Sequence, residues 1–139
     1  MDTHNQILWI KAACWAGVLP DAVVTILMLQ PAQFARTFGI GTDPGPLVAA
    51  GLLAGAPLMA GWTLLLFRAH RSPVERKEVL LITVVPVLAG FIALEVFLTG
   101  QGLTSLAALA PILALQAIPA VWYLAGYHAA RNLAAAGVT

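Results

Sequence analysis

Four long apolar stretches constrain this chain more than any other feature of its sequence. They run over about residues 7–29, 47–67, 79–99 and 103–127. A helix needs about 20 mostly apolar residues to cross a hydrocarbon core about 30 Å thick, and each stretch meets that length. Because lipid offers no partners for backbone polar groups, such segments are helices rather than strands. The sequence therefore predicts an all-α fold, an integral membrane four-helix bundle, as a single transmembrane domain over residues 1–139.

The composition excludes the main soluble classes. Apolar residues make up 60% of the 139 residues and charged residues only 9%, and the mean hydropathy is +0.89. A soluble domain carries about 25% charged residues. With a net charge of +1 the chain lacks the basic surface of a nucleic-acid binder, so no nucleic-acid partner is expected. Its single cysteine excludes a disulfide framework, and no cofactor or metal site is predicted.

The basic residues predict the orientation in the membrane. Four of them lie between the second and third stretches: Arg68, Arg71, Arg76 and Lys77. With four spans both termini lie on the side of this loop, which adds Lys11 and Arg131 to it and leaves Arg36 on the other side. Because basic residues concentrate on the cytoplasmic side, the sequence predicts a multi-pass protein of the inner (cytoplasmic) membrane with both termini cytoplasmic.

Two connections between the stretches carry local signals. Pro31 opens a segment that places Phe34 and Phe38 on one side, which predicts a short interfacial helix. In the basic loop, Ser72 and Glu75 match the Ser-x-x-Glu pattern of a capping box. This pattern predicts that the third membrane helix begins at Ser72, before the chain enters the lipid.

Two acids lie inside the predicted spans. Asp21 is near the middle of the first span, and Glu95 is in the outer half of the third. An ionisable side chain in lipid costs about 2.5–3.5 kcal/mol on insertion scales, so such residues are functional candidates by default. Asp21 shares a helix face with Gly17 and Thr25, which favours a face turned towards the other helices. A purely structural role, in which Asp21 fixes helix packing, stays open beside the functional one.

Polar and aromatic residues on other spans extend this candidate site. Gln116 and Tyr123 lie on one face of the fourth span, and Trp62 lies on the second span at the phase of Gly51-x-x-x-Gly55. If these faces meet the one with Asp21, they line a single cavity. The predicted ligand-binding residues are therefore Asp21, Glu95, Gln116, Trp62, Tyr123 and Thr25. In that cavity Asp21 would act as counter-ion or proton carrier, Gln116 as hydrogen-bond donor, and the two aromatic residues as walls.

Three functions are compatible with this pattern. The first is binding, with transport as its extension, of a small hydrophobic or cationic ligand in a cavity around Asp21. The second is an accessory or structural subunit of a membrane complex, and the third is an intramembrane isomerase in which Asp21 and Glu95 divide acid and base duties. The expected partners are the lipid bilayer, such a ligand, and a second copy in a homodimer or a larger membrane complex. The Gly51-x-x-x-Gly55 pattern fits packing within one chain and a dimer seam equally well.

Residues 61–86 carry a family resemblance. Their sequence, GWTLLLFRAHRSPVERKEVLLITVVP, resembles a signature of uncharacterised small four-span prokaryotic membrane proteins. This resemblance implies the four-span topology and no particular activity. More loosely, the chain is similar to the sterol-isomerase and sigma-2-receptor (EXPERA) group, which implies a small helical bundle with intramembrane acids around an amphiphile cavity. The chain departs from that group because its second acid, Glu95, falls on the third span rather than the second.

Overall fold

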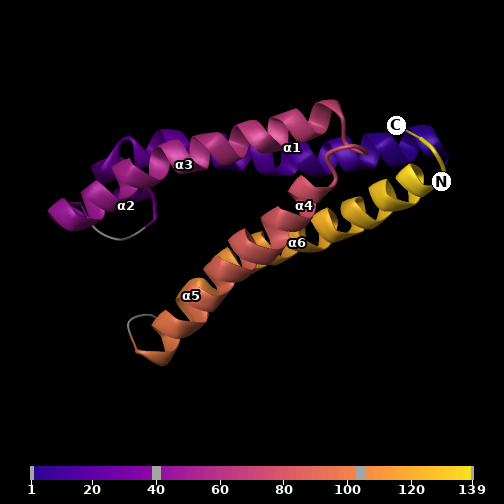
Figure 1. Ribbon diagram of the computed structural model, residues 1–139. Coiled ribbons are helices and arrows are strands. Elements are labelled where there is room, and N and C mark those ends of the chain that lie inside the picture. Colours follow the sequence, from indigo (N-terminus) through magenta and orange to yellow (C-terminus); the bar gives the residue numbers. More distant parts are fainter. Residues whose placement is uncertain (1, 39–41, 103–105, 139) are drawn as a thin grey trace. The chain divides into compact units, whose positions relative to one another are not determined.

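The computed structural model describes residues 2–38, 42–102 and 106–138, and within these ranges it contains helices and no strand (Figure 1). The elements are α1 (Thr3–Met28), α2 (Pro31–Thr37), α3 (Gly45–Arg71), α4 (Glu78–Ile82), the π-helix η1 (Thr83–Leu88), α5 (Ala89–Gly100) and α6 (Leu106–Ala135). The predicted all-α class is therefore confirmed.

Three of the helices in the described ranges are long and apolar enough to cross a membrane: Thr3–Met28, Gly45–Arg71 and Glu78–Phe97. They coincide with the first three predicted spans. The fourth predicted span begins at residues 103–105, outside the described residues, and continues into α6. The structure thus supports a membrane protein with transmembrane helices, and the arrangement as a four-span bundle stays a prediction.

The apolar side chains that point outward have the distribution expected of helices in lipid. Leu58 on α3 is 77% exposed and Val121 on α6 is 69% exposed. Each Å² of apolar surface that is exposed to water rather than covered costs about 25 cal/mol of free energy. A surface of this kind is favourable when lipid chains cover it, so the exposure pattern agrees with the composition.

The third predicted span is interrupted by a π-helix that the sequence analysis missed. Pro86 has no N–H, and in an α-helix its ring would clash with the carbonyl group of Ile82. The backbone widens here: the N–H of Ala89 donates to the carbonyl oxygen of Val84, five residues earlier. A π-turn holds one residue more than an α-turn, so every later residue is rotated by about 100° relative to an uninterrupted α-helix.

The capping box predicted at Ser72 is wrong. Residues 72–77 form a turn, and α4 begins only at Glu78 without a side-chain cap at its first residue. The N–H of Arg76 donates to the backbone carbonyl of Ser72 at 3.0 Å, which closes a single turn, but the side chains of Ser72 and Glu75 make no hydrogen bond to any described residue. Because α3 continues as far as Arg71, only these six residues connect α3 to α4. The Ser72 hydroxyl and the Glu75 carboxylate consequently have no capping role.

The short helix predicted after Pro31 is confirmed as a helix. It is α2, which begins at Pro31 in the first helical turn, where the missing N–H costs nothing. The rings of Phe34 and Phe38 lie on the same side, with centroids 4.5 Å apart. Its location at the membrane surface stays a prediction.

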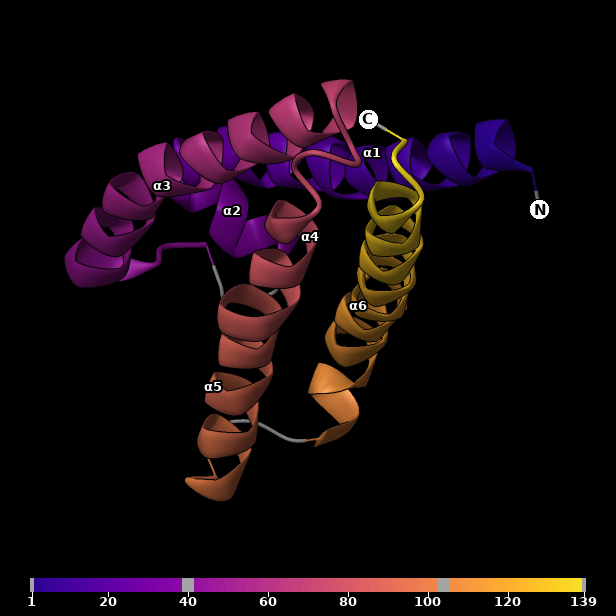
Figure 2. The same cartoon turned by 45° about the vertical axis from the view of Figure 1, so that its right-hand side comes forward.

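The chain divides into two compact units, of which the first joins Met1–Cys14 to Arg68–Thr139. In this unit α4, η1 and α5 follow one another alongside α6 (Figure 2). Small residues allow close approach at its centre: a Cβ added to Gly126 would lie 3.3 Å from Leu80 Cδ1 and 3.8 Å from Ala13 Cβ. Ile10, Ala13 and Leu80 are completely or almost completely buried. They form the core of this unit.

The second unit, Trp15–Phe67, contains the rest of α1, α2 and most of α3. Trp15 and Phe67 pack edge to face, with ring centroids 5.9 Å apart. A Cβ added to Gly55 would lie only 2.6 Å from Met28 Cε, whereas one added to Gly51 would meet nothing within 4 Å. Of the two glycines in the Gly51-x-x-x-Gly55 pattern, Gly55 therefore packs inside the chain. The prediction of a single transmembrane domain stays a prediction.

These two glycines allow a matched test of packing. We expect Gly55→Ile to lower the free energy of unfolding in detergent by about 1–3 kcal/mol, the usual cost of overpacking. Gly51→Ile makes the same chemical change where space is open, and it should leave the stability unchanged or slightly higher. Gly55→Ala should be tolerated, because the Met28 methyl group can move aside. Equal effects of the two isoleucine variants would contradict the close approach of α1 and α3.

Candidate functional site

A hydrogen bond between two neighbouring helices joins two of the six predicted residues. Gln116 Nε2 on α6 donates to Glu95 Oε1 on α5 at 2.7 Å. Both side chains are half-buried. A bond this short is typical of a pair in which one partner is charged. The structure therefore places an acid and an amide together, as the predicted site requires.

The same two side chains each keep one buried oxygen without a partner. Glu95 Oε2 and Gln116 Oε1 make no hydrogen bond to any described residue. Both atoms are acceptors when the acid is ionised, and a buried acceptor left unsatisfied costs about 1–3 kcal/mol. A proton on Glu95 or a donor group from a ligand would satisfy them. The pair therefore has unused acceptor capacity.

Other contacts fix the surroundings of this pair. The hydroxyl of Thr99 donates to the backbone oxygen of Glu95 at 2.9 Å, so it is bound within its own helix. Tyr123, two turns further along α6 from Gln116, is only 2% exposed. Tyr123 therefore lies in the packed interior of the first unit, as expected of a wall residue.

Asp21 lies in the second unit on the buried face of α1. Gly17 and Val18, one turn before it, are buried, and Asp21 itself is half-buried. The predicted inward-facing side of this helix is therefore confirmed. Among the described residues of its unit, the Asp21 carboxylate accepts no hydrogen bond and forms no ion pair.

Thr25 and Trp62 also belong to the second unit. The hydroxyl of Thr25 donates to the backbone oxygen of Asp21 at 2.7 Å, so its hydrogen is already used. Trp62 presents a buried indole Nε1 that has no acceptor among the described residues. Trp62 can therefore supply a donor as well as an apolar wall.

The structure thus groups Asp21, Thr25 and Trp62 in one unit, and Glu95, Gln116 and Tyr123 in the other. The cavity predicted around Asp21 stays a prediction. A pocket of about 360 Å³ lies elsewhere in the first unit, and none of the six predicted residues lines it. This pocket was not predicted from the sequence, although the basic loop was a signal for it.

Comparisons of the chain with protein families, curated proteins and solved structures give no match. The resemblance to small four-span prokaryotic membrane proteins and the looser one to the EXPERA group stay predictions. Within the described ranges no group of three or more His, Cys, Asp and Glu side chains could hold a metal ion. The chemistry of the candidate site therefore rests on its carboxyl, amide and indole groups.

The contact between Glu95 and Gln116 can be tested by a double-mutant cycle. We expect Gln116→Leu to lower the free energy of unfolding in mixed micelles by about 1–3 kcal/mol, because Glu95 then loses its donor. With Glu95→Leu added, the total loss should be smaller than the sum of the single losses, with a coupling of about 1 kcal/mol. A control cycle pairs Gln116→Leu with Thr63→Val, whose hydroxyl bonds within α3, and should show no coupling. Zero coupling in both cycles would contradict the hydrogen bond.

Proposed function

We propose that the protein binds a small hydrophobic, cationic ligand inside the membrane, with the Glu95–Gln116 pair as its polar anchor. The observation that carries this proposal is the pair of buried oxygens without partners, Glu95 Oε2 and Gln116 Oε1. Both need a donor, and the ionised acid also needs a positive charge in an apolar surrounding. A protonated amine on an apolar body supplies both.

The donor capacity of the ligand is part of the proposal. A primary ammonium group has three N–H donors and one positive charge, so one such group can reach both unsatisfied oxygens. A quaternary ammonium group has the same charge and no donor. The ligand is therefore proposed to be an amine rather than any lipophilic cation.

Asp21 is proposed as the second acid of the same function. Its carboxylate lies on the buried face of α1 and has no hydrogen-bond partner among the described residues of its unit. An acid in that state can exchange a proton with little competition from neighbouring groups. Transport, the extension of binding, would require that amine binding at Glu95 changes the proton affinity of Asp21.

The proposed setting is a four-span bundle of the inner (cytoplasmic) membrane with both termini cytoplasmic. The distribution of basic residues supports this orientation, since Arg36 is the one Lys or Arg outside the proposed cytoplasmic side. The indole rings of Trp9 and Trp122 lie together, with centroids 5.1 Å apart. Paired tryptophans near the proposed cytoplasmic ends of two spans fit an aromatic belt.

The ligand proposal is tested with hexylammonium and hexyltrimethylammonium as probes on the purified protein in detergent. We expect hexylammonium to raise the melting temperature of the unaltered chain and the trimethyl analogue to bind about tenfold more weakly, because it cannot donate. Glu95→Gln should weaken hexylammonium binding by at least about tenfold. Glu78→Gln removes an acid outside the pair and should respond as the unaltered chain does. Unchanged binding in Glu95→Gln would refute the proposal.

The topology is tested by labelling single cysteines in a Cys14→Ser background. We expect Asp43→Cys and Gln101→Cys to react with a membrane-impermeant maleimide in intact cells. Lys77→Cys and Asn132→Cys should react only after the membrane is opened, because both would lie in the cytoplasm. Labelling of residues 101 and 132 from the same side would show that the chain between them does not cross the membrane.

A further inference from the structure

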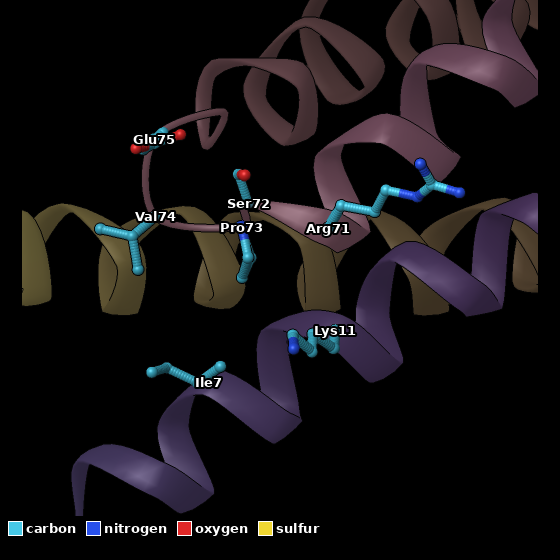
Figure 3. Close-up of a pocket in the computed structure, with 7 residues that line it drawn as sticks. All are labelled: Ile7, Lys11, Arg71, Ser72, Pro73, Val74 and Glu75. Carbon is cyan, nitrogen blue, oxygen red and sulfur yellow. The ribbon is translucent and has the colours of Figure 1, made fainter. Parts of the chain in front are cut away.

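A pocket separate from the Glu95–Gln116 pair lies within the first unit (Figure 3). It is formed by Ile7 and Lys11 of α1 and by residues 71–75, where α3 ends and the chain turns towards α4. Its volume of about 360 Å³ falls within the range of small-ligand sites, about 300–1,000 Å³. Two segments far apart in the sequence thus build one pocket.

The pocket combines a positive charge with an unused donor. Lys11 is half-buried, and its ammonium group makes no hydrogen bond or ion pair with any described residue. The hydroxyl of Ser72, which has no capping role, likewise has no partner among the described residues. Arg71 adds a second positive charge to the wall. An ammonium group and a hydroxyl group on one pocket favour a ligand with several acceptor oxygens and a negative charge.

The net charge of the pocket lining indicates how many negative charges its ligand carries. Lys11 and Arg71 each carry one positive charge, and Glu75 carries one negative charge on the same lining. Figure 3 shows the Glu75 carboxylate on the opposite side of Ser72 and Pro73 from the Arg71 guanidinium. The net charge of the lining therefore matches a singly charged anion, such as a phosphodiester, better than a doubly charged phosphomonoester.

The position of the pocket along the helices favours an amphiphile. Trp9, two residues before Lys11, contacts Trp122, and tryptophan gathers where hydrocarbon meets head groups. Apolar side chains from both segments, Ile7 and Val74, complete the lining beside the charged ones. The long stem of Lys11 can lie along apolar surface while its ammonium group reaches the polar region.

We propose that this pocket is a phosphodiester site that takes the head group of an anionic phospholipid, held by Lys11 and Ser72, with Arg71 adding positive charge on the same lining. The anchor would fix the cytoplasmic end of α1 against the turn after α3. This proposal is independent of ligand binding at Glu95 and Gln116.

The test measures the melting temperature of the delipidated protein in dodecyl maltoside with three additives: dioleoylphosphatidylglycerol, dioleoylphosphatidylcholine and inorganic phosphate. We expect phosphatidylglycerol to raise the melting temperature most. Phosphatidylcholine should act more weakly, because its own cation faces Lys11 and Arg71. Lys11→Gln should weaken the apparent affinity for phosphatidylglycerol by about fivefold, from the loss of one interfacial charge. Ser72→Ala should weaken it without a change in charge.

Lys77→Gln is the matched control. It removes one positive charge from the same loop at a residue that does not line the pocket, so its response to phosphatidylglycerol should match that of the unaltered chain. An equal, Lys11-dependent response to inorganic phosphate would support the phosphate site and assign it to a soluble phosphate ester. If Lys11→Gln and Ser72→Ala both respond as Lys77→Gln does, the proposal is overturned. Should Lys11→Gln fail to fold, Ser72→Ala decides alone.

Discussion

Internal hydrogen bonding of the backbone is the constraint on which the rest of this structure depends, because apolar helices have no other partners in lipid. For the same reason, hydroxyl groups within the helices form hydrogen bonds to the backbone of their own helix. Four threonines donate to the carbonyl group four residues earlier, at 2.7–2.9 Å: Thr25, Thr63, Thr83 and Thr99. Few polar groups keep unused capacity after this. Among the buried side chains that the structure describes, Glu95, Gln116, Trp62 and Trp122 each keep an atom without a partner, where a ligand can gain a hydrogen bond.

Proline removes one backbone hydrogen bond from a helix. The contact between Glu95 and Gln116 depends on whether the backbone stays α-helical around a proline or widens into a π-helix. α1 contains Pro20 and α3 contains Pro57, and both remain α-helical around them. At Pro86 the chain forms η1 instead. The extra residue in that turn rotates everything after it by about 100°. Glu95 follows η1 by seven residues, so the face on which it meets Gln116 is set by this turn.

The sequence predicts the helices well because their length and apolar character come from the membrane itself. It also predicts the buried face of α1 with Asp21, since a 3.6-residue period holds in an undisturbed helix. The predicted start of the third helix is wrong: Ser72 and Glu75 match the capping pattern, but residues 72–77 form a turn and α4 begins only at Glu78. The contact of Glu95 with Gln116 depends on the rotation that η1 gives to the residues after it. A 3.6-residue period in the sequence does not predict that rotation. The pocket at Lys11 depends on a long-range approach that only tertiary packing creates.

The acidic and basic residues of the chain differ in what the membrane does to them. An acid inside a span costs about 2.5–3.5 kcal/mol, whereas a basic residue near an anionic surface gains about 1 kcal/mol. In the proposed orientation, Lys11 and the basic loop lie at the membrane surface, where a phosphate head group would match their donors. Glu95 gains nothing comparable from its surroundings beyond the amide of Gln116. In the proposed function, a ligand that carries both charge and donors supplies the interactions that this acid lacks in the span.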